Sequence, residues 1–285
     1  MSITSAATIV ELNLSVWTGN KIDKDASRKV TDDNYAAAEA GFFRKNLMAG
    51  TGKRKEIADM AARCRLWHNT CTLPWADRGG RLLPTSMFLD YKQQLDRRRD
   101  QFERAVEEFI HDYPQLVQDA QQHLGNLFKS EDYPSQEEVA SKFGFRVVFS
   151  PVPDSGDFRL DLPAQELEQV KRDYDNAFND RIADAMREPW ERLHEMLTRM
   201  SEKLTEPEGD SEIKRRWHDT FVTNATDLCT MLTHLNLTKD PKLEAARRDL
   251  ERAISGVDIE DIKEDADVRA DTKAKLDNIL KSYQW

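Results

Sequence analysis

The chain has 285 residues and a net charge of −10; 33% of its residues are charged, 39% are hydrophobic, and only 11 are glycine and 10 proline. This length suffices for a sizeable core, and the charge-rich, glycine-poor composition is typical of long exposed helices and not of a compact α/β enzyme, whose crossovers consume glycine. The net charge disfavours general binding to a phosphate backbone, but it is compatible with a local basic patch.

The N-terminal sequence and the cysteine count bear on the cellular compartment. The apolar run 8–17 is interrupted by Glu11 and Asn13, so we expect no signal peptide. No apolar stretch approaches the roughly 20 residues that a membrane span needs. The 3 cysteines are an odd number. We therefore expect free thiols in a reducing, cytoplasmic setting.

The N-terminal part is predicted to hold one strand, two helices and a loop. Apolar residues alternate with period two from Val10 to Val16, which predicts a half-buried strand over 8–17. A helix is expected from residue 31 or 32 to about residue 48, with Tyr35, Phe42 and Phe43 as its apolar residues. A second helix follows the glycine break at 50–52 and runs from about residue 53 to 71. The segment 73–84 contains two prolines and two glycines and is expected to be a shaped loop.

Apolar side chains at helical spacing predict three long helices further along the chain. The first covers 88–127 and is expected to kink or restart near Pro114. The second covers 167–204, which at 1.5 Å per residue is about 60 Å, with a bend at Pro189. The third covers 213–235. Asp240 as N-cap and Pro241 at the first helical position then predict the start of a new helix, the first of two or three smaller ones.

Residues 145–162 form the second predicted β element. Two short β runs meet across a connection rich in proline, which is typical of a β-hairpin. A capping box at 135–138 starts a short helix just before it. Because an isolated hairpin is marginal in water, it needs a third strand or a helix. The strand 8–17 is the obvious candidate for that third strand.

These elements predict a mainly α fold. We expect an elongated antiparallel bundle of long helices, with a small β-sheet of the N-terminal strand and the hairpin at one end. The predicted division is 1–85 for the N-terminal strand and helices with the Pro/Gly loop, 86–240 for the long-helix bundle carrying the hairpin 145–162, and 241–285 for the C-terminal short helices.

No constellation of residues predicts an enzyme, a cofactor site or a metal site. Residues 50–53 lack the first glycine, the Ser or Thr and the preceding strand that a phosphate-binding loop needs. Cys64, His68 and Cys71 share one helical face, but three ligands from one helix close a zinc tetrahedron poorly, which favours a buried face with a satisfied histidine. A di-metal bundle needs the Glu-x-x-His unit twice, and 191–194 supplies it once. We therefore assign no catalytic, cofactor-binding or metal-binding residue and expect a non-enzymatic protein.

Two loops hold the candidate protein-interaction residues. Trp75, Arg78 and Arg81 lie in the Pro/Gly loop, and an aromatic residue beside arginines on a loop is typical of recognition surfaces. In the alternative interpretation Trp75 plugs a bundle end and the arginines pair with helix carboxylates. The end of the hairpin adds further candidates, namely Asp154, Asp157, Phe158 and Arg159.

Several segments together resemble a family of proteins of unknown function carried by tailed bacteriophages and integrative mobile elements. The resemblance spans about 8–250 and is carried by the order and spacing of the segments 14–19, 73–75, 81–84, 151–159 and 235–241. Members of this family are often encoded near recombination genes and near a MoxR-type AAA+ ATPase similar to a cobaltochelatase subunit. The resemblance implies that context, and such an ATPase as a partner, but no activity.

The leading hypothesis is a non-enzymatic phage or mobile-element scaffold or adaptor, located in the host cytoplasm, that acts through protein–protein contacts. One alternative is a DNA-binding accessory to replication or recombination, which would use the basic segments 53–65 and 97–99. Another is an acidic anti-defence protein that mimics DNA through 258–267 and occupies a host nuclease or sensor. No membrane contact is expected.

Overall fold

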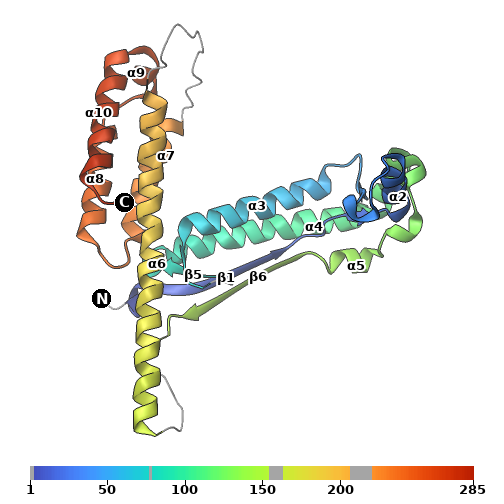
Figure 1. Cartoon of the computed structure of the whole chain (residues 1–285), viewed down its shortest axis with the longest axis horizontal. Helices are drawn as coiled ribbons and strands as arrows, with labels where there is room; N and C mark the ends of the chain where they lie inside the picture. Colours follow the sequence, from blue (N-terminus) through green and yellow to red (C-terminus); the bar gives the residue numbers. More distant parts are fainter. Residues whose placement is uncertain (1–2, 77–78, 154–162, 206–219) are drawn as a thin grey trace. The chain divides into compact units, whose positions relative to one another are not determined.

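The computed structural model describes residues 3–76, 79–153, 163–205 and 220–285 (Figure 1). It is mainly helical with a small antiparallel sheet, which confirms the predicted fold class. Contacts divide the chain into two compact units. Unit 1 comprises Met1–Glu11, Thr70–Leu89 and Phe149–Trp285, and unit 2 comprises Leu12–Asn69 and Asp90–Val148. The ranges 1–85, 86–240 and 241–285 follow the chain, whereas these contacts join segments that are distant in sequence.

The main sheet has four strands in the order β4-β5-β1-β6. They are β1 (Ala7–Ser15), β4 (Leu73–Pro74), β5 (Gly80–Pro84) and β6 (Gly144–Pro151). The predicted N-terminal strand is confirmed as β1, and the first arm of the predicted hairpin is β6, beside β1 as expected. The second arm lies in 154–162, outside the described residues. The expectation of a loop over 73–84 is wrong, because this segment forms β4 and β5, and Leu82 lies fully buried opposite Leu73 and Ile9.

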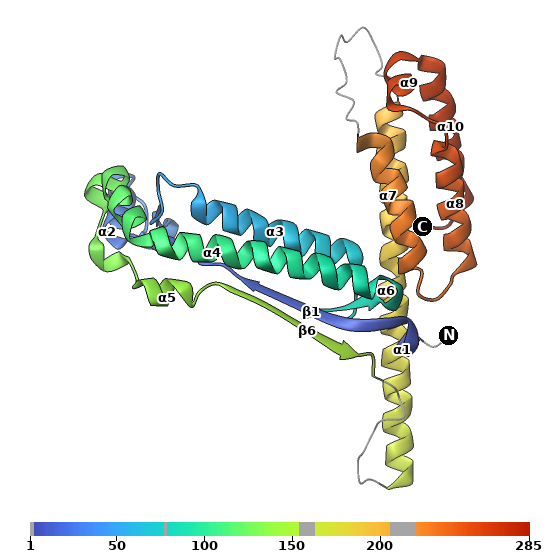
Figure 2. The same cartoon turned by 180° about the vertical axis from the view of Figure 1, so that it is seen from behind.

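Unit 1 holds a bundle built on the C-terminal half of α6 (Ala164–Leu204). Both views show α7 (Thr220–Leu235), α8 (Pro241–Ile254) and α10 (Ala266–Ser282) alongside this half, with α9 (Ile259–Glu264) between α8 and α10 in sequence (Figures 1 and 2). The bundle closes over fully buried leucines such as Leu197 and Leu250. The predicted restart is confirmed, because the Asp240 carboxylate accepts from the Lys242 N–H and Pro241 begins α8.

Unit 2 places α3 (Lys53–Cys71) and α4 (Phe88–Leu124) side by side in both views (Figures 1 and 2). The predicted apolar stripe on α4 is confirmed by the burial of Phe102, Phe109 and Leu116. Trp17 follows β1 and packs its ring against Phe109 at 6.3 Å. The helix continues through Pro114 without a restart. The capping box at Ser135 is present and begins α5 (Gln136–Ala140).

One predicted helix of unit 2 is wrong. Instead of a helix over 31–48, the chain forms β2 (Asn20–Ile22), α2 (Lys24–Asp33), the 3₁₀ turn η1 (Ala38–Ala40) and β3 (Arg44–Asn46). The physical reason is an earlier N-cap, because the Asp23 carboxylate accepts from the N–H groups of Asp25 and Ala26. β2 and β3 pair antiparallel in a separate two-stranded sheet.

Several short elements complete the described chain, and none of its helices has an apolar stretch long enough to cross a membrane. The short elements are α1 (Ile3–Ala6), η2 (Thr85–Met87), η3 (Gly125–Leu127) and η4 (Ser130–Asp132).

Candidate protein-interaction surface

Two of the predicted interaction residues are held inside unit 1. Trp75 is buried, and its ring meets Phe178 edge-on at 5.4 Å. The Arg81 guanidinium donates to Thr72 Oγ1 at 2.7 Å and pairs with the Glu188 carboxylate at 3.3 Å. This arrangement matches the alternative interpretation, in which the arginine pairs with a helix carboxylate. Arg78, Asp154, Asp157, Phe158 and Arg159 lie outside the described residues.

The cysteine and histidine cluster of α3 has an ordinary structural explanation. His68 is buried, and its Nδ1 lies 2.7 Å from the Tyr91 hydroxyl. Cys64, Cys71 and Cys229 are buried free thiols, and burial raises the pKa of Cys229 to about 11. Among the described residues, no group of three or more His, Cys, Asp or Glu side chains is placed to hold a metal ion.

The segments considered for DNA binding and DNA mimicry also have roles within the fold. Four of the basic side chains contact carboxylates or aromatic rings of unit 2, as follows: Lys53 with Asp112, Lys55 with Asp59, Arg98 over Trp67 at 4.6 Å, and Arg99 over Phe145 at 5.4 Å. In the acidic segment 258–267, Asp258 and Asp265 are the N-caps of α9 and α10. Because these side chains already interact within the fold, fewer of the basic charges are available to bind DNA and fewer of the acidic charges are available to mimic it.

A different part of unit 2, which no sequence motif indicated, has the features of a contact surface. We call it the tip: residues 20–46, containing β2, α2, η1 and β3, with the segment 127–133 against which they dock. The tip lies at the end of unit 2 where α4 ends (Figure 1). The Tyr133 hydroxyl donates to the carbonyl of Leu47, the residue that follows β3, at 2.9 Å, which fixes the segment 127–133 beside the end of β3.

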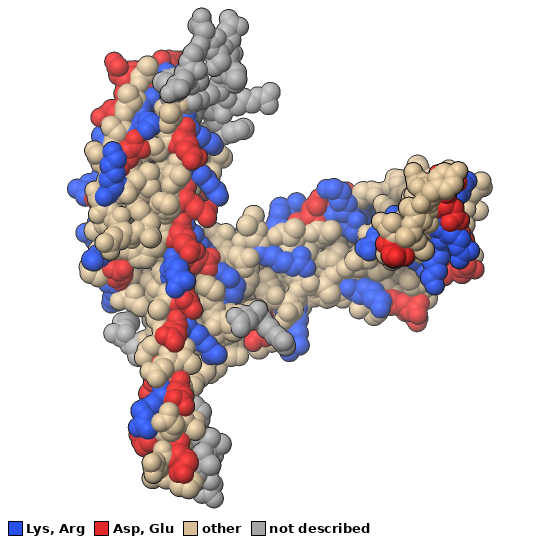
Figure 3. Space-filling view, viewed as in Figure 1, with Lys and Arg blue, Asp and Glu red and all other residues tan. Residues whose placement is uncertain are grey.

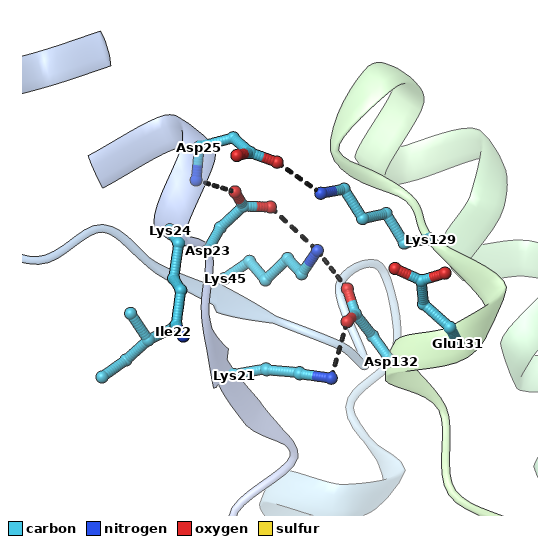
Figure 4. A pocket seen from close by; sticks show the side chains of 9 residues that line it. All are labelled: Lys21, Ile22, Asp23, Lys24, Asp25, Lys45, Lys129, Glu131 and Asp132. Atoms are coloured by element: carbon cyan, nitrogen blue, oxygen red, sulfur yellow. Dashed lines mark hydrogen bonds and ion pairs between the residues drawn. The ribbon is translucent and has the colours of Figure 1, made fainter. Parts of the chain in front are cut away.

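The tip is held by a buried lysine between two aspartates (Figure 4). The Lys45 ammonium pairs with Asp132, with Asp23 Oδ2 at 2.9 Å and with the Leu127 carbonyl at 2.9 Å. These three acceptors satisfy its three N–H donors. At 3% exposure Lys45 is among the most buried charged residues described, so its charge depends on the two carboxylates.

Further ion pairs extend this network to the surface. Lys21 binds the second oxygen of Asp132 at 2.8 Å, and Lys129 binds Asp25 at 2.7 Å. All of these side chains line a cavity of about 270 Å³ (Figure 4). Backbone N–H donation from Ala26, reinforced by Lys45, lowers the pKa of Asp23 to about 2. Hydrogen bonds from Lys21 and Lys45 outweigh burial and lower the pKa of Asp132. Both carboxylates are therefore charged at neutral pH.

Polar side chains, not apolar ones, anchor α2 to the rest of the tip. Its buried residues are Ser27 and Thr31. The Ser27 hydroxyl donates to the Asp23 carbonyl at 2.6 Å and accepts from the Phe43 N–H at 2.9 Å. The helix therefore docks mainly through hydrogen bonds: of its two apolar side chains, Ala26 is only partly buried and Val30 is exposed.

The apolar side chains of the tip face outward instead. Every residue from Asn34 to Arg44 is exposed, including four alanines. Tyr35 is 100% exposed and Phe42 67% exposed. Large hydrophobic side chains exposed elsewhere in the described chain are scattered singly, whereas five cluster here, namely Ile22, Val30, Tyr35, Phe42 and Phe43. Clustered exposure of this kind marks a contact surface more often than an isolated exposed side chain does.

Tyr35 also occupies a backbone conformation that favours glycine. Its φ is +51°, in the left-handed region. The Tyr35 N–H donates to the Asp32 carbonyl and the Ala36 N–H to the Thr31 carbonyl, which is the Schellman pattern at the end of a helix. The residue at this position is usually glycine, because other residues pay about 1–2 kcal/mol there. A fully exposed tyrosine at a strained position gives the fold no packing in return.

Charges of both signs surround these apolar side chains. In Figure 3 the end of unit 2 that carries α2 shows an uncharged area bordered by both blue and red side chains. Unit 2 contains equal numbers of acidic and basic residues, so the net charge of −10 falls on unit 1. The tip therefore belongs to the neutral unit.

Comparison of the chain with protein-family models, curated proteins and solved structures finds no match.

Proposed function

We propose that this protein is a non-enzymatic adaptor that acts through protein–protein contacts, and that the tip of unit 2 is a contact surface. The observation that carries the proposal is the exposed segment from Asn34 to Arg44, with Tyr35 fully exposed in a left-handed conformation. Burying a large apolar side chain stabilises a protein by about 1.5–3 kcal/mol. The fold gains none of this free energy from the fully exposed Tyr35 and only a part from Phe42, so a partner that covers both side chains would gain the rest.

The chemistry of the surface favours a protein partner. Aromatic side chains with a mixed polar rim are the composition of protein–protein interfaces, and tyrosine is a frequent hot-spot residue. Nucleic acid selects an excess of positive charge, and the neutral unit 2 does not offer one.

A MoxR-type AAA+ ATPase is the partner that the family resemblance proposes, in the host cytoplasm. This proposal is tested by co-expressing the tagged chain with a MoxR-type AAA+ ATPase. Co-purification of the ATPase supports it, and recovery of the chain alone counts against it.

The test of the contact surface compares matched variants in affinity capture from cells of the source, with bound proteins identified by mass spectrometry. Tyr35→Gly and Phe42→Ser remove exposed apolar groups from the tip. Leu89→Ser is the control, because Leu89 is 81% exposed but lies in unit 1. We expect a specific protein to be captured by the wild type and Leu89→Ser and lost from both tip variants. A set of captured proteins that is identical for all four chains contradicts the proposal.

A further inference from the structure

We infer that the occupant of the tip is a second copy of this chain, so that the protein forms a two-fold dimer through its tips. This inference rests on the proposed function, since it identifies the partner of the same surface. Four observations carry it: the charge balance of the two units, the unpaired charges of the tip, their order along α2, and the extent of the exposed surface.

The charge balance determines where two identical chains can meet. Unit 1 carries the whole net charge of −10, so two copies of it repel each other. Unit 2 is neutral and bears the clustered exposed apolar side chains. Contact through unit 2 therefore brings together surfaces of a unit without net charge and covers the exposed apolar side chains.

A two-fold contact requires a surface that complements itself, because residue i meets residue j and residue j meets residue i. A patch of one sign would repel its own copy. The tip carries both signs on exposed side chains that have no ion-pair partner among the described residues. The basic ones are Lys24, Arg28, Lys29 and Arg44, and the acidic ones are Asp32, Asp33, Glu39 and Glu131.

The order of these charges along α2 suits an antiparallel pair. Arg28 and Lys29 precede Asp32 and Asp33 by about one helical turn. When two copies of α2 run antiparallel, the basic pair of one faces the acidic pair of the other, twice over. Val30, which is 52% exposed, lies between the two pairs in sequence and places an apolar group near the two-fold axis.

The size of the exposed surface also fits. All residues in 20–44 are exposed except Asp23, Ala26, Ser27 and Thr31. A stable interface uses about 20–30 residues a side, with aromatic side chains near its centre and charged ones at its rim. Tyr35, Phe42 and Phe43 supply aromatic side chains beyond the C-terminal end of α2, and the exposed charges supply the polar part of this surface.

The first experiment measures the mass of the full chain by light scattering after size exclusion, and by sedimentation equilibrium, over a range of concentrations. We expect the wild type and Leu89→Ser to reach twice the monomer mass of 32.9 kDa. Tyr35→Gly and Phe42→Ser should each weaken dimerisation at least about tenfold. A wild type that stays monomeric at every concentration, or a dimer unaffected by both tip variants, overturns the inference.

The second experiment uses charge reversal. Arg28→Glu with Lys29→Glu in one chain, and Asp32→Lys with Asp33→Lys in another, should each make the chain monomeric, because like charges then face each other. Mixing the two chains should restore a dimer, since every facing pair is again opposite in sign. Failure of the mixture to dimerise, while the wild type does, overturns the antiparallel arrangement.

The two proposals fail in different ways. If the wild type is monomeric but loses a captured protein on Tyr35→Gly, the tip binds another protein and only the self-association is wrong. If Tyr35→Gly changes neither mass nor capture, the proposed contact surface is wrong as well.

Discussion

The bundle of unit 1 and the tip of unit 2 are held together by opposite means. In the bundle, Leu197 and Leu250 are fully buried, and the apolar stripes of the helices pack against each other. In the tip, α2 buries Ser27 and Thr31, and a lysine sits between two aspartates, while the large hydrophobic side chains are exposed. Polar interactions thus stabilise the tip, while its large apolar side chains stay exposed and are available for the contact that we propose.

The largest expected effect comes from removing the lysine that holds the tip. Lys45→Met should destabilise the tip by about 3–5 kcal/mol, because Asp23 and Asp132 would remain buried without their shared counter-ion. Amide hydrogen exchange of 24–33 should accelerate accordingly. Lys55→Met is the matched control, since Lys55 pairs on the surface, and a surface pair contributes about 0–1 kcal/mol. Equal exchange rates in the two variants would contradict the role of Lys45.

The corresponding change in the bundle removes apolar packing. Leu197→Ala should lower the free energy of unfolding by about 2–5 kcal/mol, because Leu197 is fully buried and its loss leaves a cavity. Urea unfolding measures the change, and Leu89→Ala, at an exposed site, should alter it by less than about 0.5 kcal/mol. Hydrogen exchange of the α2 amides should accelerate only as much as the lower global free energy of unfolding predicts. Faster exchange confined to α2 would show that the tip depends on the apolar packing of the bundle, which would contradict the separate stabilisation of the two regions.

Acid should destabilise the tip before the bundle in the wild-type chain. The pKa of Asp23 is lowered to about 2 in the folded chain, and that of Asp132 is also lowered. A depressed folded pKa gives stability that is present above the unfolded value of about 4 and is lost as the pH falls through the folded value. We expect exchange in α2 to accelerate between about pH 4 and pH 2, after correction for intrinsic rates. A loss of protection already complete at pH 5 would contradict the assignment.

The smallest expected effect has the opposite sign. Tyr35→Gly should raise the stability of the tip by about 0.5–1 kcal/mol. Glycine adopts the left-handed conformation without the steric cost, and its larger loss of backbone entropy on folding offsets part of this gain. Hydrogen exchange of the last turn of α2 measures the gain. Tyr35→Ala keeps the strain while removing the ring and should show no gain. Destabilisation by Tyr35→Gly would mean that the ring contributes to the fold.

Local signals in the sequence predicted most of the fold outside the tip. The alternation around Val10, the capping box at Ser135 and the Asp240–Pro241 restart each depend on neighbouring residues, and each is confirmed. The short strands β4 and β5 are not predicted, because Pro74 and the glycines of 79–80 resemble a loop, and the strands form only through the pairing of β5 with β1 and with β4.

The tip could not be predicted, because its structure is decided by contacts distant in sequence. The alanines of 36–40 favour a helix, and the pairing of Lys45 with Asp132 has no local signature. One local signal was present: Asp23 is a good N-cap, and it would have started the helix earlier. With α2 ending at Asp33, Tyr35 and Phe42 would have been left without a helix face to occupy. The predicted contact residues Trp75 and Arg81 were chosen by residue type, and the fold engages both within unit 1.

The central claim is that Tyr35 serves association and not folding. It is tested most directly by measuring, on the same two samples, the unfolding of the tip by hydrogen exchange and the monomer–dimer equilibrium by sedimentation, for the wild type and Tyr35→Gly. We expect Tyr35→Gly to have a more stable tip and at least about tenfold weaker association. A less stable tip with unchanged association would contradict it.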